Sequence, residues 1–195
     1  QQFTKWMHTL ILGPAIKEAR SGVFKGISHL VDVGGGSGAF CMAIKAHHPE
    51  TRVSLMDLPQ VCDASKSFLE QDGFDQLIER YPCNFFEGEW PQDANSFHLS
   101  NILHDWPVED CKSILRNLFD ALPIGGTCFI HEVLFNSNKN GPLSAALFNL
   151  LMAINHKSQQ FSLGELSEML EEIGFSAVSI VHQHGPYSLV KASKI

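Results

Sequence analysis

The chain has 195 residues, 14 Lys and Arg against 21 Asp and Glu, and a formal net charge of -7. No apolar run approaches the roughly 18 residues of a membrane span, and the acidic balance lacks the basic surface that nucleic-acid binding needs. We therefore expect neither a membrane nor a nucleic-acid partner. A domain of this length buries roughly 70% of its unfolded surface, so it needs no disulfide or structural metal to form a core.

The five cysteines indicate a reducing compartment. They are odd in number, widely scattered and without C-x-x-C spacing, which is typical neither of a disulfide framework nor of a zinc site. We therefore expect no metal and a cytoplasmic location. The chain opens with Gln1-Gln2-Phe3 and no initiator Met, so we expect it to be part of a longer protein.

Helical and strand patterns alternate along the chain. Residues 3–20 carry apolar side chains at helical spacing with a Gly13-Pro14 interruption, which predicts a broken lead-in helix. A glycine turn at 34–38 joins the first strand to the helix that follows it. The pattern predicts strands at 29–33, 53–56, 81–85, 96–103, 127–133, 177–182 and 187–192, and further helices at 59–71, from 107 onwards, at 142–155 and at 162–173.

Repeated strand-helix units predict a mainly parallel sheet with helices on both faces. The short Gly185-Pro186 turn forces the last two strands into an antiparallel pair. We therefore expect an α/β, Rossmann-like fold with a seven-stranded sheet and an antiparallel last strand. The domain organisation that we expect is a lead-in helical segment at 1–24 and a ligand-binding domain at 25–195.

Ligands of such sheets bind beyond the carboxyl ends of the strands, so the strand ends hold the candidate site. The first strand ends in Gly34-Gly35-Gly36-Ser37-Gly38, where the missing Cβ atoms let a ligand approach the backbone. Asp57 ends the second strand about twenty residues later, where a carboxylate can accept hydrogen bonds from both ribose hydroxyls. Together, the glycine loop and the Asp57 carboxylate predict an adenosine-type cofactor. A nicotinamide cofactor stays open, because the loop also fits G-x-G-x-x-[GA] with Ala39.

The fourth strand and its end carry a more specific pattern. The segment Leu99-Ser100-Asn101-Ile102-Leu103-His104-Asp105-Trp106-Pro107-Val108-Glu109-Asp110-Cys111, taken with Val31-Asp32-Val33 and the glycines, resembles the S-adenosylmethionine-dependent O-methyltransferases of the caffeate and hydroxyindole type. Bacterial relatives of these enzymes act in polyketide and antibiotic pathways. The resemblance spans 31–191 and implies a class I methyltransferase fold, with S-adenosylmethionine as cofactor and S-adenosylhomocysteine as product.

The resemblance places the family's general base at His104 and an acidic residue that orients this base at Glu132. Histidine suits the step, because moving a proton from a phenol near pKa 10 to an imidazole near 6.5 costs only about 5 kcal/mol. An aliphatic hydroxyl would cost about 12 kcal/mol. We therefore expect metal-independent methyl transfer to a phenolic or enolic hydroxyl of a small molecule or a polyketide-type intermediate.

The resemblance also implies the residues around the two ligands. The family's second flanking carboxylate falls on Gln160, an Asp that contacts the cofactor falls on Asn84, and a Lys falls on Ser100. The residues expected to bind the cofactor are Asp32, Gly34, Gly36, Asp57, Leu58, Asn84, Phe85, Ser100 and Trp106. Those expected to bind the acceptor are Phe148, Met152, His156 and Gln160, although spacing alone fits core packing on a helix equally well.

Family members usually carry an N-terminal winged-helix module that dimerises and closes the acceptor pocket, and we expect this module to be absent here. The chain is then a monomer, a domain of a larger synthase, or part of a protein that dimerises at full length. Two other functions stay open: an NAD-dependent oxidoreductase, and a cofactor-binding domain without catalysis.

Overall fold

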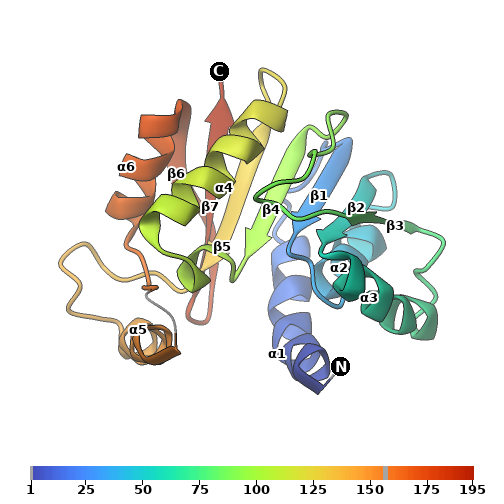
Figure 1. Cartoon of the computed structure of the whole chain (residues 1–195), viewed down its shortest axis with the longest axis horizontal. Helices are drawn as coiled ribbons and strands as arrows, with labels where there is room; N and C mark the ends of the chain where they lie inside the picture. The colour runs from blue at the N-terminus through green and yellow to red at the C-terminus, as the bar shows by residue number, and fades with distance from the viewer. Residues whose placement is uncertain (1, 156–157) are drawn as a thin grey trace.

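The computed structural model describes residues 2–155 and 158–195, and it consists of one seven-stranded sheet between two layers of helices (Figure 1). The strands are β1 (His29–Val33), β2 (Arg52–Asp57), β3 (Ile78–Pro82), β4 (Ser96–Ser100), β5 (Thr127–Glu132), β6 (Phe175–His184) and β7 (Tyr187–Lys194). The helices are α1 (Gln2–Ala19), α2 (Ala39–His47), α3 (Pro59–Gln71), α4 (Val108–Ala121), α5 (Leu143–Asn155) and α6 (Leu163–Ile173), with a 3₁₀ turn η1 (Leu103–Asp105) after β4.

The strand order is β3-β2-β1-β4-β5-β7-β6. The pairs from β3 to β5 are all parallel, whereas β7 runs antiparallel between β5 and β6. This confirms the predicted α/β fold with an antiparallel last strand. The chain leaves β1 towards β2 and later returns to β4 on the other side, so the order reverses between β1 and β4. A reversal of this kind opens a crevice at the carboxyl ends of the two strands.

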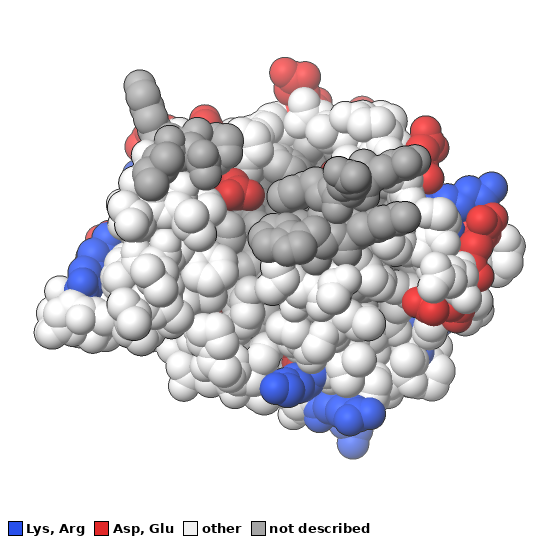
Figure 2. All heavy atoms as spheres, turned by 90° about the horizontal axis from the view of Figure 1, so that it is seen from below, with Lys and Arg blue, Asp and Glu red and all other residues white. Residues whose placement is uncertain are grey.

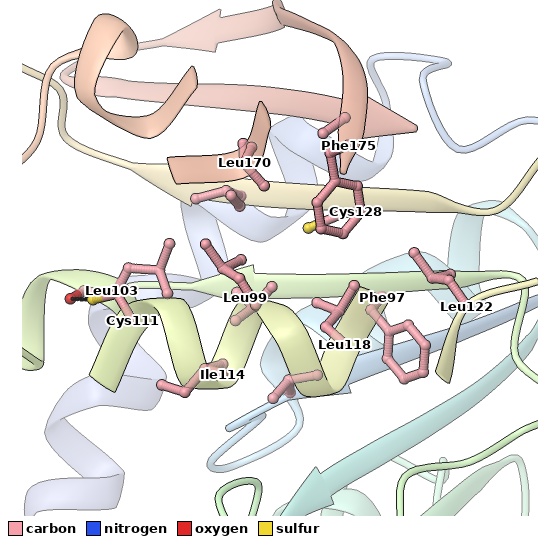
Figure 3. Packing of buried hydrophobic residues seen from close by; sticks show 14 of the residues in the cluster. Phe97, Leu99, Leu103, Cys111, Ile114, Leu118, Leu122, Cys128, Leu170 and Phe175 are labelled. Atoms are coloured by element: carbon pink, nitrogen blue, oxygen red, sulfur yellow. Dashed lines mark hydrogen bonds between the residues drawn. The ribbon is translucent and has the colours of Figure 1, made fainter. Parts of the chain in front are cut away.

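Alternating side chains on the strands form two separate cores. On β1, Leu30 belongs to the core that holds side chains of α1, α2 and α3, whereas Val31 and Val33 belong to the core that also holds side chains of α4 and α6. Figure 3 shows the second core, in which Phe97 and Leu99 of β4 meet side chains from α4 and α6. Because each fully buried side chain of this size contributes roughly 1.5–3 kcal/mol, the two layers hold the sheet and its strand ends rigidly.

Helix α1 differs from the prediction, because it continues through Gly13-Pro14 without a break. A proline inside a helix costs about 3 kcal/mol through the lost N–H and the clash with the preceding turn. Two fully buried alanines, Ala15 and Ala19, pack the helix into the same core as α2. Tertiary packing of this face outweighs the local cost, which the sequence pattern alone does not reveal.

Strands β3 and β4 each end three residues earlier than predicted. Strand β3 occupies Ile78–Pro82 instead of 81–85, because the Asn84 side chain accepts a hydrogen bond from the Phe86 N–H (3.1 Å) and turns the chain. Strand β4 ends at Ser100 rather than at 103. Asn101 has a φ of 56°, in the left-handed region, and the apolar residues after it belong to η1.

Candidate active site

A cavity of about 300 Å³ lies at the crevice between β1 and β4, at the carboxyl ends of the parallel strands. Figure 2 looks at this end of the molecule, where most of the charged side chains lie towards the periphery. The cavity is lined by Ile11, Asp32, Gly34, Gly35, Gly36, Ser37, Ala39, Phe40, Asp57, Val61, Ser100, Asn101, Ile102 and Asp105.

The glycine loop forms one wall of the cavity. Gly34 and Gly36 have φ values of 67° and 57°, which only glycine adopts without strain. A Cβ on Gly34 would lie 2.4 Å from Cδ1 of Ile102, whereas a Cβ on Gly36 would meet no described atom within 4 Å. Gly34 therefore allows the loop to pack against η1, and Gly36 leaves open space beside the loop.

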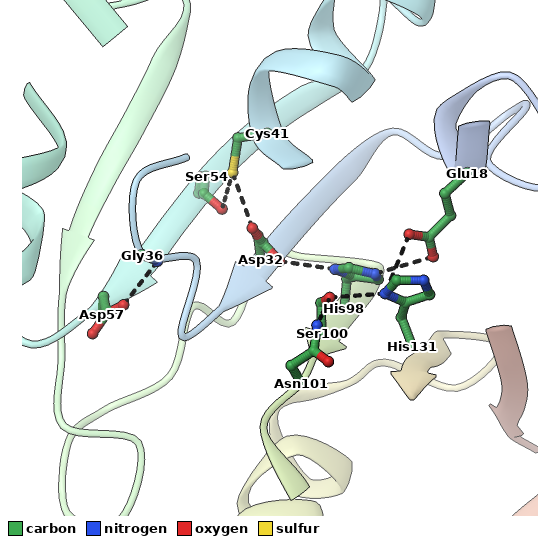
Figure 4. Close-up of polar contacts among 10 residues, drawn as sticks. All are labelled: Glu18, Asp32, Gly36, Cys41, Ser54, Asp57, His98, Ser100, Asn101 and His131. Atoms are coloured by element: carbon green, nitrogen blue, oxygen red, sulfur yellow. Dashed lines mark hydrogen bonds and ion pairs between the residues drawn. The ribbon is translucent and has the colours of Figure 1, made fainter. Parts of the chain in front are cut away.

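Asp57 lies at the end of β2, next to this loop (Figure 4). Its Oδ2 accepts a hydrogen bond from the Gly36 N–H at 2.9 Å, and its Oδ1 accepts one from the Leu58 N–H at 2.7 Å. Burial raises the pKa of Asp57, although both backbone hydrogen bonds oppose this. Each carboxylate oxygen keeps a second lone pair, so Asp57 can still accept hydrogen bonds from a ligand's hydroxyl groups.

Asp32 lies deeper in the cavity wall and is only 2% exposed. Its Oδ1 accepts a hydrogen bond from Nδ1 of His98 at 2.8 Å, and its Oδ2 accepts a weak one from the Cys41 thiol at 3.6 Å (Figure 4). The far side of His98 contacts Glu18 of α1, with 3.2 Å between Nε2 and Oε1. The sequence predicted Asp32 but missed this buried cluster.

Ser100 and Asn101 line the cavity at the end of β4. The Ser100 Oγ lies 2.8 Å from Nδ1 of His131, and it accepts a hydrogen bond from Nδ2 of Asn101 at 3.1 Å. The Asn101 backbone N–H donates to the His131 carbonyl at 3.0 Å. Asn101 was not predicted as a site residue. The sequence placed Asn101 inside the predicted strand 96–103, so only the structure reveals this role.

His104 and Glu132 form a buried pair at the same end of the sheet. The Nδ1–H of His104, in η1, donates to Oε2 of Glu132, the last residue of β5, at 2.6 Å. Burial lowers the pKa of His104, but the charge and hydrogen bond of Glu132, with a contribution from Asp105, outweigh this and raise it above the usual value. The Nε2 of His104 lies 3.5 Å from Oδ1 of Asp105, which lines the cavity. The structure thus brings together the two residues predicted for catalysis.

Four of the residues predicted to bind the cofactor are not among those that line the cavity in the part of the chain that the structure describes. Leu58 is 37% exposed, and Asn84 forms the turn after β3. Phe85 and Trp106 pack edge to face with their ring centroids 5.9 Å apart. Both are partly buried against the core that includes the side chains of α4. In contrast, Asp32, Gly34, Gly36, Asp57 and Ser100 all line it.

The residues predicted to bind the acceptor lie on α5 and in the segment after it. Phe148 and Met152 are both partly buried on α5, and His156 falls outside the described residues. Gln160 is 1% exposed, and neither its Oε1 nor its Nε2 has a hydrogen-bond partner among the described residues. Its backbone N–H donates to Oδ1 of Asn149 at 2.9 Å. Leaving both ends of a buried amide unpaired costs about 1–3 kcal/mol for each group.

The sequence also missed four apolar side chains that line the cavity. Ile11 of α1, Phe40 of α2 and Val61 of α3 line it together with Ile102. Phe40 lies in the first turn of α2, two residues after the end of the glycine loop, so its position could have suggested this role. Ile11 could not be assigned, because only the packed position of α1 brings it to the strand ends.

No described helix is both long enough and apolar enough to cross a membrane.

Comparison with known proteins identifies the family. A family model described as an O-methyltransferase domain matches residues 3–176. The chain is 31% identical over 186 residues to 3-hydroxy-5-methyl-1-naphthoate 3-O-methyltransferase of Streptomyces sahachiroi, covering 95% of this chain and 54% of that protein. It is 29% identical over 165 residues to acetylserotonin O-methyltransferase of Bos taurus, covering 85% of this chain and 47% of that protein.

A solved structure of PigF with SAH superposes with a TM-score of 0.91 at 27% identity, covering 98% of this chain and 58% of that one. The chain spans about half the length of the curated relatives that it matches. The family model covers most of the sequence, and the sheet order and the glycine loop agree with the predicted class. The chain therefore belongs to the O-methyltransferase domain family.

Proposed function

We propose that this chain is the catalytic part of an S-adenosylmethionine-dependent O-methyltransferase that methylates a phenolic or enolic hydroxyl of a small molecule or a polyketide-type intermediate. The observation that carries the proposal is the buried His104–Glu132 pair next to the cavity at the strand-order reversal. The relatives are named for methylating a hydroxynaphthoate and acetylserotonin, which fits small hydroxyl acceptors.

The cavity fits S-adenosylmethionine, whose sulfonium supplies an activated methyl group when the cofactor is bound. Asp57 accepts the ribose hydroxyls, and Gly36 leaves room for the ligand to approach the backbone. Asp32, Gly34 and Ser100 form the remaining polar wall. Leu58, Asn84, Phe85 and Trp106 flank the adenine end from outside the cavity lining, and the product left behind is S-adenosylhomocysteine.

His104 accepts the acceptor's proton at Nε2 while Glu132 holds Nδ1–H. This arrangement fixes the tautomer and stabilises the imidazolium that forms. The raised pKa of His104 narrows the gap to a phenol, so deprotonation costs less than the about 5 kcal/mol of an unperturbed pair. Since positioning and proton removal are the protein's tasks in this reaction, we propose a metal-independent mechanism.

Phe148, Met152 and Gln160 are proposed to form the acceptor side of the site, together with His156 outside the described residues. Gln160 replaces a carboxylate expected from the family pattern, and its unpaired amide offers an NH2 group that donates and a carbonyl oxygen that accepts. Ile11 lines the cavity, so we infer that the lead-in segment 1–24 works with the domain 25–195 rather than as a linker. We propose a cytoplasmic protein without nucleic-acid or membrane partners, either monomeric or part of a larger synthase or dimer.

The test combines binding and turnover. Calorimetric titration with S-adenosylhomocysteine and, separately, with NAD distinguishes the proposed cofactor from a nicotinamide. Methyl transfer from labelled S-adenosylmethionine to a panel of phenols, with and without EDTA, then tests the reaction and its metal independence. Binding of NAD alone would show that the chain is an oxidoreductase domain, and binding of S-adenosylhomocysteine without any transfer would favour a domain without catalysis.

A further inference from the structure

We propose that Glu18 and His98 are positioning residues for the cofactor. Together they clamp helix α1 against β1 and β4, so that the apolar and polar side chains that line the cofactor cavity keep their positions. Neither residue lines the cavity, and both act through residues that do. This inference rests on the proposed function, because it takes the cavity to be the cofactor site.

The clamp is a buried chain of contacts from α1 to the cavity wall (Figure 4). His98 is 0% exposed and bridges Oε1 of Glu18, at 3.2 Å, and Oδ1 of Asp32, at 2.8 Å. The Phe40 ring stacks on the His98 imidazole with 3.6 Å between ring centroids. Asp32 and Phe40 both line the cavity, so His98 supports two of its walls at once.

Glu18 also reaches a second wall through His131. Its Oε2 lies 3.8 Å from Nδ1 of His131, and the same Nδ1 lies 2.8 Å from Oγ of Ser100. Ser100 also lines the cavity, and it ends the strand β4 that neighbours β1. Through its two carboxylate oxygens, Glu18 thus contacts the residues that hold both strand ends flanking the crevice.

The face of α1 that carries Glu18 also covers the cavity. His8, Ile11, Ala15 and Glu18 are spaced by three or four residues, so they share one face of the helix. Nδ1 of His8 lies 2.9 Å from Oγ of Ser37 in the glycine loop, and Ile11 lines the cavity. The helix is therefore attached near both ends of this face, with Ile11 between the two attachments.

Ion pairs, and not only apolar packing, hold the clamp together. Two carboxylates flank one imidazole, and removing one partner from a buried ion pair leaves an unpaired charge. Burial lowers the pKa of His98, but Glu18 and Asp32 outweigh this and raise it to about 9, so the clamp is ionised at neutral pH. The other titratable groups nearby are His131 of β5, which stacks near His98, Cys41 of α2 beside Asp32, and His184 of β6, whose charge acts on Glu18.

The experiment measures S-adenosylhomocysteine binding by calorimetry to the wild-type chain and to Glu18→Gln, His98→Gln and His29→Gln. His29 is the matched control, since it is also a buried histidine with a side-chain hydrogen bond, to Ser54, but neither His29 nor Ser54 is among the described residues that line the cavity. We expect the dissociation constant to rise about tenfold or more in the first two variants, because each loses a charged hydrogen bond. In His29→Gln it should change less than about twofold.

The pH dependence of binding supplies a readout that general destabilisation does not produce. With 5′-methylthioadenosine, which has no amino-acid group to titrate, wild-type affinity should fall as the pH rises through about 9, and His98→Gln should show no such fall. Folded variants that bind as tightly as wild type would overturn the clamp. If the variants do not fold, a flat wild-type affinity between about pH 7 and 10 would overturn it as well. Failure of the wild-type chain to bind S-adenosylhomocysteine would instead refute the proposed function.

Discussion

Nδ1 of His104 lies 2.6 Å from Oε2 of Glu132, and the two residues are 6% and 1% exposed. They come from different parts of the sequence, the turn after β4 and the end of β5, and meet because these two strands are parallel neighbours. A buried carboxylate at hydrogen-bonding distance stabilises the protonated imidazole. The pair is therefore suited to take up a proton and to hold it during methyl transfer.

Replacing His104 by Gln should abolish most of the turnover and leave cofactor binding intact. Loss of a general base typically costs 10²- to 10⁴-fold in rate, so we expect kcat to fall by about 10³-fold. The S-adenosylhomocysteine dissociation constant should stay within about threefold, because His104 does not line the cavity. Steady-state methyl transfer at saturating substrates and calorimetry measure the two quantities. Undiminished transfer would exclude His104 as the base.

Replacing Glu132 by Gln should move the pH profile of kcat to lower pH. The base works when His104 is unprotonated, so activity rises as pH increases through its pKa, which Glu132 helps to raise. Without that charge, burial dominates and the pKa falls, so the acidic limb should appear at lower pH while the maximal rate decreases. Measurements of kcat from pH 5 to 9 at saturating substrates check this prediction. This pH range brackets the ordinary histidine pKa of about 6.5. An unmoved limb would contradict the proposed pairing.

The His104–Glu132 pair could be predicted because both residues stand at the ends of strands in recognisable patterns. The parallel topology was equally accessible, since strand and helix patterns alternate along the chain. The end of β4 could not be predicted from the sequence, because Ile102 and Leu103 continue the apolar run of the strand. Only the left-handed conformation of Asn101 shows that the chain turns there into η1.

The clamp could not be predicted, for a different reason. Glu18 and His98 are 80 positions apart, and each alone is an ordinary polar residue in an apolar context. A buried charge becomes favourable only through a partner, so its meaning depends on packing rather than on local pattern. The same applies to Ile11, which reaches the cavity because α1 continues through Pro14.

Gly36→Ala should weaken cofactor binding, and Gly22→Ala supplies its matched control. Both glycines have positive φ values, 57° and 79°, and neither Cβ would meet a described atom within 4 Å. Each substitution should therefore cost a similar backbone strain, about 1–2 kcal/mol of unfolding free energy. Only the Gly36 methyl group would project beside the cavity, so only that variant should raise the S-adenosylhomocysteine dissociation constant. Equal binding by both variants would place the ligand elsewhere.

Folding stability should be highest near pH 6.5 if the buried histidines dominate its pH dependence. The folded-state pKa of His98 is raised to about 9, so its contribution is complete below the unfolded value and is lost as pH rises through 9. Burial and the charge of His98 lower the pKa of His131 to about 4, so stability also declines as pH falls from about 6.5 towards 4. Urea unfolding at several pH values measures both slopes. Below about pH 8, where free thiols stay protonated, His98→Gln should lose much of the alkaline slope, whereas His29→Gln should keep it.

Gln160→Leu should stabilise the free protein and impair its use of the acceptor. Both ends of the Gln160 amide are buried without a hydrogen-bond partner among the described residues, and removing such a group saves about 1–3 kcal/mol. If the amide binds the acceptor, as proposed, the same change should raise the acceptor's KM by about tenfold and leave that of S-adenosylmethionine unchanged. Thermal unfolding and steady-state kinetics report the two effects separately. A gain in stability with an unchanged acceptor KM would mean that Gln160 does not contact the acceptor. The substitution can stabilise the free protein and also weaken acceptor binding only if the acceptor forms hydrogen bonds with the amide.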